Sequence, residues 1–104
     1  METTQAVTAL AALAQETRLD VFRLLVEAGP DGLAAGEISE HLEIPSATLS
    51  FHLKELRAAG LVACERVGRS RIYRPEFAEM QRLLDFLTRD CCGGVPRRRS
   101  ARGR

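Results

Sequence analysis

Two adjacent cysteines near the end of the chain, Cys91 and Cys92, could together hold a soft ion. Thiolates are soft ligands that select thiophilic ions over hard ones. Trivalent arsenic or antimony binds sulfur in a pyramidal arrangement, so two neighbouring thiolates can clamp one such ion. Gly93 and Gly94 follow the pair and leave the backbone free to adapt. The spacing therefore predicts a sensory site for trivalent arsenic or antimony.

The sequence leaves the identity of the ion and the role of the remaining cysteine, Cys64, open. Strand alternation puts Cys64 on the same face as Val62, which favours a core position over a role as a third ligand. With two thiolates at hand, a methylated trivalent arsenical fits as well as arsenite or antimonite. Alternatively, Cys91 and Cys92 form a strained adjacent disulfide and act as a redox switch.

Other chemistries lack the residues that they need. His41 and His52 are the only histidines, and neither lies near a cysteine in the sequence. We therefore predict no zinc site. The chain shows no nucleophile–base pattern and no glycine-rich phosphate loop, so we do not expect an enzyme.

A second set of candidate residues lies on a helix predicted to begin at Ser46, as its N-cap, and to end at Gly60. Leu49, Leu53 and Leu56 recur at helical spacing and form one apolar stripe. The opposite face is small, polar and cationic apart from one phenylalanine, which suits the major groove of DNA. We expect DNA contacts from the side chains of Ser46, Thr48, Ser50, Phe51, His52 and Lys54, and from two arginines further along, Arg69 and Arg71.

The neighbouring elements favour DNA binding over an ordinary amphipathic surface helix. A short helix is predicted upstream, at Gly36–Leu42. Two short strands are predicted downstream, at Leu61–Cys64 and Arg71–Arg74, joined by a hairpin with Gly68 at its tip. Helix, turn, helix and basic hairpin is the order of a winged helix. In this setting His52 contacts either a phosphate or a neighbouring helix.

Three further helices complete the predicted fold. They run from a cap at Thr3 or Thr4 to about Ala14, from Glu16 to Ala28, and, started by Pro75, from Glu76 to about Asp90. The first and last carry more apolar side chains than one small domain can bury, which favours a two-fold dimer through these helices. The prediction is thus mainly α, with about five helices and a two-stranded wing. It places one domain at residues 1–92 and a flexible basic tail at residues 93–104.

Charge is segregated along the chain although the net charge is only +1. Residues 1–45 hold two arginines and eight acidic residues, whereas residues 46–75 hold six basic and two acidic residues. The positive segment is the one predicted to meet DNA. No apolar run approaches the ~18 residues of a membrane-spanning helix, and no signal peptide is evident, so we expect a cytoplasmic protein without a membrane partner.

The segments SATLSFHLKELRAAGLV, ETRLDVFRLL and VGRSRIYR together resemble the ArsR/SmtB family of metal-sensing bacterial repressors over about Leu10–Cys92. The resemblance implies a homodimeric winged-helix repressor that leaves its operator when an inducer binds. It also implies a role for Cys91 and Cys92, because several arsenic-responsive members carry a Cys-Cys-Gly run at this helix end. In some members a third cysteine follows further along, and this sequence has none there.

Taken together, these features predict a repressor of double-stranded operator DNA that is released by arsenite, methylarsenite or antimonite at Cys91 and Cys92. The resemblance does not extend to the family's Asp/His/Glu zinc site, because the last helix has no histidine, or to its Cys-x-Cys arsenic site, because Gly36–Leu42 has no cysteine. The rivals are the redox switch at the same two cysteines and a protein-interaction module that uses Phe51 as an exposed anchor. Arg18, at the start of the second helix, is expected to have a structural or a phosphate-contacting role.

Overall fold

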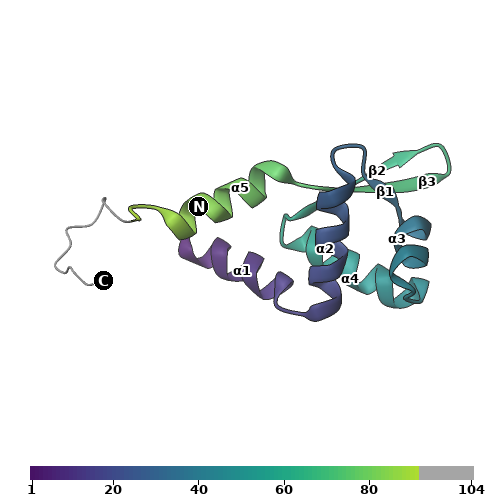
Figure 1. The fold of residues 1–104 in the computed structure, drawn as a ribbon, viewed down its shortest axis with the longest axis horizontal. Helices are drawn as coiled ribbons and strands as arrows, with labels where there is room; N and C mark the ends of the chain where they lie inside the picture. Colours follow the sequence, from purple (N-terminus) through teal and green to yellow (C-terminus); the bar gives the residue numbers. More distant parts are fainter. Residues whose placement is uncertain (92–104) are drawn as a thin grey trace.

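The computed structural model describes residues 1–91, and the predicted winged helix-turn-helix architecture is confirmed. In chain order the elements are α1 (Thr3–Leu13), α2 (Glu16–Ala28), β1 (Leu33–Ala34), α3 (Ala35–Leu42), α4 (Ser46–Ala58), β2 (Val62–Val67), β3 (Ser70–Pro75) and α5 (Phe77–Thr88). Helices α1 and α5 lie side by side at one end of the molecule, and the β2–β3 hairpin projects from the opposite end (Figure 1). Cys92 and the predicted tail lie outside the described residues.

The core forms where α2, α3 and α4 meet the base of the hairpin. The apolar stripe predicted on α4 is buried, since Leu49, Leu53 and Leu56 are each 2% exposed or less. Leu25 of α2 and Ile38 of α3 pack into the same cluster. Burial of this stripe fixes which face of α4 is turned to solvent.

The two ends of α4 differ in how well the sequence predicted them. Gly60, with φ of 79°, ends the helix as expected. Its amide donates to the carbonyl of Arg57, and the next amide, that of Leu61, donates to the carbonyl of Leu56, which is a Schellman motif. The prediction of Ser46 as N-cap was wrong. Pro45 is extended and accepts the first helical bond from Leu49 at 2.9 Å, so Ser46 is already helical.

The predicted starts of α1 and α5 were also one or two residues off. Glu2, not Thr3 or Thr4, is the N-cap of α1, and its amide donates to Oε1 of Gln5 at 2.8 Å. Pro75 does not start the last helix but ends β3, opposite Val62.

The wing is longer than predicted and gains a third strand. Strands β2 and β3 pair antiparallel out to Val67 and Ser70, which leaves a two-residue turn. Gly68 opens this turn with φ of 62°, the position where a type II′ turn needs a positive φ. The short strand β1 was not predicted and pairs with β3 on its other side, so the sheet order is β1-β3-β2.

Helices α1 and α5 each bury only one side within the chain. Ala6 and Ala9 of α1 and Leu83 of α5 are buried. The stripes predicted to face a partner remain largely exposed in the single chain, and their large exposed members are Val7, Leu10, Phe77, Leu84 and Leu87. Among residues 1–91, no helix has the length and apolar character needed to cross a membrane.

Candidate nucleic-acid interface

The solvent face of α4 carries five of the six side chains that the sequence nominated on this helix. Ser46, Thr48, Ser50, Phe51 and Lys54 are all exposed, and Phe51 is 55% exposed despite its apolar ring. No side chain caps the first turn, so its amide groups stay open to a phosphate as well as to water. This face can therefore offer hydroxyls, one ammonium group and one phenyl ring to a groove.

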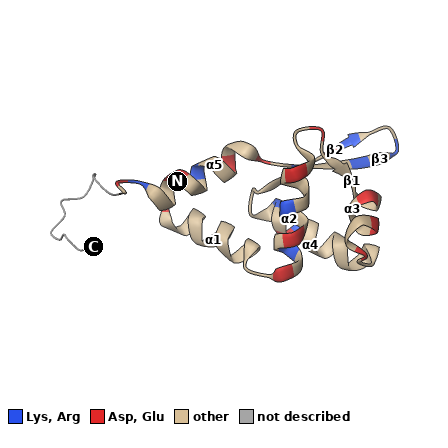
Figure 2. Cartoon of the chain, in the orientation of Figure 1, with Lys and Arg blue, Asp and Glu red and all other residues tan. Residues whose placement is uncertain are grey.

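The hairpin adds a cluster of arginines at the end of the molecule where α3 and α4 lie (Figure 2). Arg69 occupies the turn, and Arg71 lies directly opposite Arg66 in the antiparallel register. Like charges in opposite positions repel each other, and within residues 1–91 none of these three arginines forms an ion pair. Arg74 differs, because it pairs with Glu65 and donates to the carbonyl of Pro30. The uncompensated arginines suit a polyanionic partner.

The sequence reasoning missed Arg66 as a member of this cluster. Its exposure and its place across from Arg71 follow from the two-residue turn at Gly68 and Arg69. Had the hairpin register been fixed on that glycine, the pairing of the two arginines could have been read from the sequence.

His52 is the nominated residue that the structure removes from the solvent face. Its ring is only 7% exposed, and its Nδ1 lies 3.3 Å from Nη1 of Arg18. The pKa of His52 is lowered from its ordinary value by burial first and by the Arg18 guanidinium second, while Glu55 opposes them. Of the two roles left open for His52, the contact with a neighbouring helix is the one observed. Arg18 likewise has a structural position.

Two of the three cysteines, Cys64 and Cys91, lie in the part of the chain that the structure describes. Cys64 is half-buried against the core. A hydrogen bond links its side chain to the hydroxyl of Tyr73, its cross-strand neighbour. Burial first, and this bond second, raise the pKa of Tyr73. Cys91 is exposed just beyond α5, where its amide donates to the carbonyl of Thr88 at 2.9 Å. Residues 1–91 hold no cluster of three or more metal-ligating side chains, and Cys92 lies outside them.

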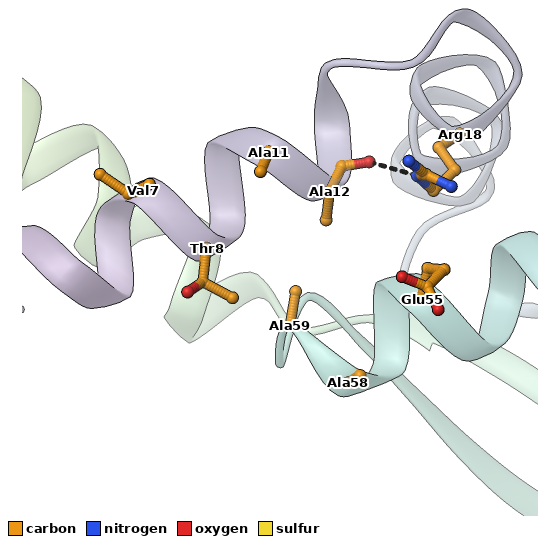
Figure 3. Close-up of a pocket in the computed structure, with 8 residues that line it drawn as sticks. All are labelled: Val7, Thr8, Ala11, Ala12, Arg18, Glu55, Ala58 and Ala59. Atoms are coloured by element: carbon orange, nitrogen blue, oxygen red, sulfur yellow. Dashed lines mark hydrogen bonds between the residues drawn. The ribbon is translucent and has the colours of Figure 1, made fainter.

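A cleft of about 430 Å³ separates α1 from α4. Its walls are small side chains, mainly Ala11 and Ala12 of α1, Ala58 at the end of α4 and the C-cap residue Ala59 (Figure 3). Arg18 and Glu55 also line it. These two helices therefore face each other mainly through small side chains, with the charged residues Arg18 and Glu55 also at the cleft.

Comparison with known proteins points to one group of regulators. A family model described as a helix-turn-helix domain matches residues 13–65, from the last residue of α1 into β2. The transcriptional activator HlyU of Vibrio cholerae is 33% identical over 88 residues, which cover 85% of this chain and 79% of HlyU. A structure of HlyU in its reduced form has a TM-score of 0.69 at 32% identity, covering 86% of this chain and 92% of HlyU.

Two further solved structures share the fold. An ArsR-like transcriptional regulator from Rhodococcus sp. RHA1 has a TM-score of 0.74 at 30% identity, covering 83% of this chain and 78% of that one. Mb0332 from Mycobacterium bovis is described as a homodimeric winged helix-turn-helix DNA-binding domain and a possible ArsR-family regulator. It has a TM-score of 0.66 at 26% identity, covering 84% of this chain and 81% of that one.

Proposed function

Because this chain belongs to the ArsR/SmtB family of helix-turn-helix transcriptional regulators, we propose that it is a repressor that holds operator DNA as a homodimer. Trivalent arsenic or antimony, bound through Cys91 and Cys92, releases it. One observation carries the DNA-binding part: the apolar stripe of α4 is buried and its polar face is exposed, and α4 and the arginine-bearing hairpin lie toward the same end of the molecule (Figure 2). That pairing of a groove-sized helix with a cationic wing suits base edges and phosphates together.

The division of labour on the DNA follows from the side chains. Ser46, Thr48, Ser50, Phe51 and Lys54 enter the major groove or flank it, where short hydroxyls reach base edges and a phenyl meets a thymine methyl group. Arg66, Arg69 and Arg71 contact phosphates from the hairpin. His52 is buried and therefore does not reach the DNA.

Dimerisation through α1 and α5 is supported by the apolar side chains that the single chain leaves exposed. Val7 and Leu10 of α1 and Leu84 and Leu87 of α5 remain open to water on two neighbouring helices. A second copy of the chain can cover this apolar surface without burying polar groups. The two-fold axis then sets the two α4 helices about 34 Å apart, the distance of one turn of DNA.

The inducer part rests on thiol chemistry. Cys91 is exposed directly after α5, so a ligand there acts at the end of a dimer helix. An ion bound at that point biases the angle between protomers and hence the spacing of the α4 helices. Binding is reciprocal, so DNA must weaken the inducer as much as the inducer weakens DNA.

A redox switch is the second candidate, and the reduced form of the relative HlyU favours it. Oxidation would join Cys91 to Cys92 in a disulfide and release two protons and two electrons to an oxidant such as peroxide. The switch would act at the same helix end as the arsenical.

Fluorescence anisotropy tests both candidates on the duplex upstream of the protein's own gene, with metal and metalloid ions titrated under reducing conditions and peroxide titrated separately without reductant. Arsenite, methylarsenite, antimonite and zinc are titrated into the complex, with Cys91→Ser and Cys92→Ser as variants and Cys64→Ser as the matched control. Release by an arsenical or antimonite in wild type and Cys64→Ser, lost in the other two, supports the proposal. Release by peroxide alone moves the function to the redox switch. Salt-independent or absent duplex binding refutes the repressor and leaves the protein-interaction module.

A further inference from the structure

Arg18 joins three helices through a single guanidinium group. It lies in the first turn of α2, where its own amide donates to Oε1 of Gln15 at 2.8 Å. Its Nε donates to the carbonyl of Ala12 at 2.7 Å, and its Nη1 lies 3.3 Å from Nδ1 of His52. Ala12 is in the last turn of α1 and His52 is in the middle of α4. Arg18 thus ties the end of one helix to the side of another.

The bond to Ala12 satisfies a carbonyl that the helix itself leaves without a partner. The last four carbonyls of an α-helix have no intrahelical donor, and a cation at that end also meets the negative pole of the helix dipole. Figure 3 shows the guanidinium reaching the Ala12 carbonyl beside the cleft between α1 and α4. Alanines line much of that cleft and cannot form such a bond, whereas the arginine donates a charge-assisted hydrogen bond there.

The bond to His52 needs a neutral imidazole. A guanidinium can only donate, so Nδ1 must accept and the ring proton of neutral His52 resides on Nε2. Protonation of Nδ1 removes the acceptor and sets two cations 3.3 Å apart in a part-buried position. The bond is therefore lost when His52 becomes charged.

The charges around His52 favour the neutral ring. Four elements pack against α4, namely α1, α2, α3 and β2. The charged groups that act on the ring are Arg18 from α2 and Glu55 from α4 itself, while α1 lines the cleft with uncharged residues. Burial and Arg18 outweigh Glu55, so the pKa of His52 lies below its ordinary value. His52 therefore gains its charge at a lower pH than an exposed histidine does.

We propose that Arg18 is a positioning residue that couples the dimer helix α1 to the recognition helix α4 through Ala12 and His52, and that acid uncouples them. The inference rests on the proposed function, since it gives α1 and α4 those two roles. Uncoupling of α1 from α4 should lower the affinity for DNA in acid. Ordinary electrostatics gives the opposite sign, because a protein that gains protons binds a polyanion more tightly.

NMR on the isotope-labelled full chain tests the link without DNA. In wild type, the His52 ring and the backbone amide of Leu13, which shares its peptide group with the Ala12 carbonyl, should titrate with one midpoint below about pH 6.5. In Arg18→Gln the midpoint of His52 should rise part of the way to the ordinary value, because burial remains, and Leu13 should no longer respond. A Leu13 amide that ignores the titration of His52 in wild type overturns the coupling.

Anisotropy on the upstream duplex at constant salt tests the consequence. Wild type should lose at least about fivefold in affinity between about pH 7.5 and about pH 5.5, the size of a weak allosteric coupling. His52→Asn keeps an acceptor near the place of Nδ1 and cannot titrate, so its affinity should stay within about twofold. His41→Asn alters the other, exposed histidine and should fall like wild type.

The outcomes separate the inference from the proposed function. A rise in affinity for wild type in acid, or an equal fall for His52→Asn, refutes the acid uncoupling. Circular dichroism at each pH checks that His52→Asn and His41→Asn remain folded. If wild type does not bind the duplex at about pH 7.5, the proposed function fails, and the Leu13 titration still decides whether Arg18 links the two helices.

Discussion

Gly32 lies against the backbone of Tyr73 at the point where β1 joins the sheet. A Cβ atom at position 32 would overlap the carbonyl oxygen of Tyr73 and would lie 2.8 Å from Cγ of Arg74. Gly32 also has φ of 71°, a conformation that side chains disfavour. Glycine is therefore required at position 32 for two reasons, the close approach to Tyr73 and the positive φ. It lets Leu33 and Ala34 reach β3.

Replacement of Gly32 by alanine should lower the free energy of unfolding by about 2–3 kcal/mol. About 1 kcal/mol comes from the positive φ, and the rest comes from overlap with backbone that cannot move aside. Urea denaturation followed by circular dichroism measures the loss. Gly68→Ala is the matched control, because Gly68 has φ of 62° and nothing within 4 Å of its Cβ position. Equal losses in the two variants would show that the overlap with Tyr73 is relieved at no cost.

Strand β1, which Gly32 permits, could not be predicted from the sequence. The stripe of Leu49, Leu53 and Leu56 predicted α4 because apolar residues that recur at this spacing lie on one face of a helix. Leu33 and Ala34 show no period, and their pairing with β3 depends on residues about forty positions away. A two-residue strand of this kind is made by tertiary contact alone.

His52 shows the same limit within the candidate site. Its place on α4 next to Leu53 puts it at the margin of the buried stripe, where helical period alone does not decide between core and solvent. Its partner Arg18 is 34 residues away. The contact with Arg18 accompanies the burial of His52, and no local pattern encodes that contact. By contrast, the exposure of Ser50, Phe51 and Lys54 followed directly from the stripe.

Leu84→Glu should dissociate the proposed dimer. A carboxylate placed in an apolar interface without a partner costs about 3 kcal/mol. A two-fold dimer contains the substitution twice, so dimerisation weakens by about 10⁴-fold. Sedimentation equilibrium measures the change. Leu19→Glu on α2 is the matched control, since Leu19 is 45% exposed against 47% for Leu84 and lies on neither dimer helix. Dissociation by Leu19→Glu, with Leu84→Glu still dimeric, would move the interface to α2.

Arg69→Ala should weaken binding to all duplexes alike. Loss of one phosphate contact lowers the slope of log affinity against log salt by about 0.9. Anisotropy at several salt concentrations, on the upstream duplex and on a scrambled one, gives that slope. Arg82→Ala on α5 removes an exposed arginine that pairs with Glu79 and should leave the slope unchanged. A change in sequence preference with the slope intact would contradict the placement of Arg69 at the phosphates.

Arg66→Glu should stabilise the free protein while it weakens DNA binding. The variant exchanges repulsion across from Arg71 for attraction, a gain of about 0.5 kcal/mol on an exposed hairpin. The same change puts a negative charge where a phosphate would lie. Thermal denaturation and anisotropy measure the two effects. If the stability and the DNA affinity both fall, repulsion between Arg66 and Arg71 does not destabilise the wing of the free protein.

Cys64→Ala should leave release by arsenicals unchanged and act instead on Tyr73. Burial is the larger cause of the raised pKa of Tyr73, so loss of the bond to Cys64 returns that pKa only part of the way to the ordinary value of about 10. Because Tyr73 is the single tyrosine of the chain, its ultraviolet titration reports this directly. A raised pKa also means that the folded state holds its proton longer than the unfolded state. The free energy of unfolding should therefore fall as pH rises above about 10, and less steeply in Cys64→Ala than in wild type. An inducer response lost in Cys64→Ala would instead identify Cys64 as a third ligand.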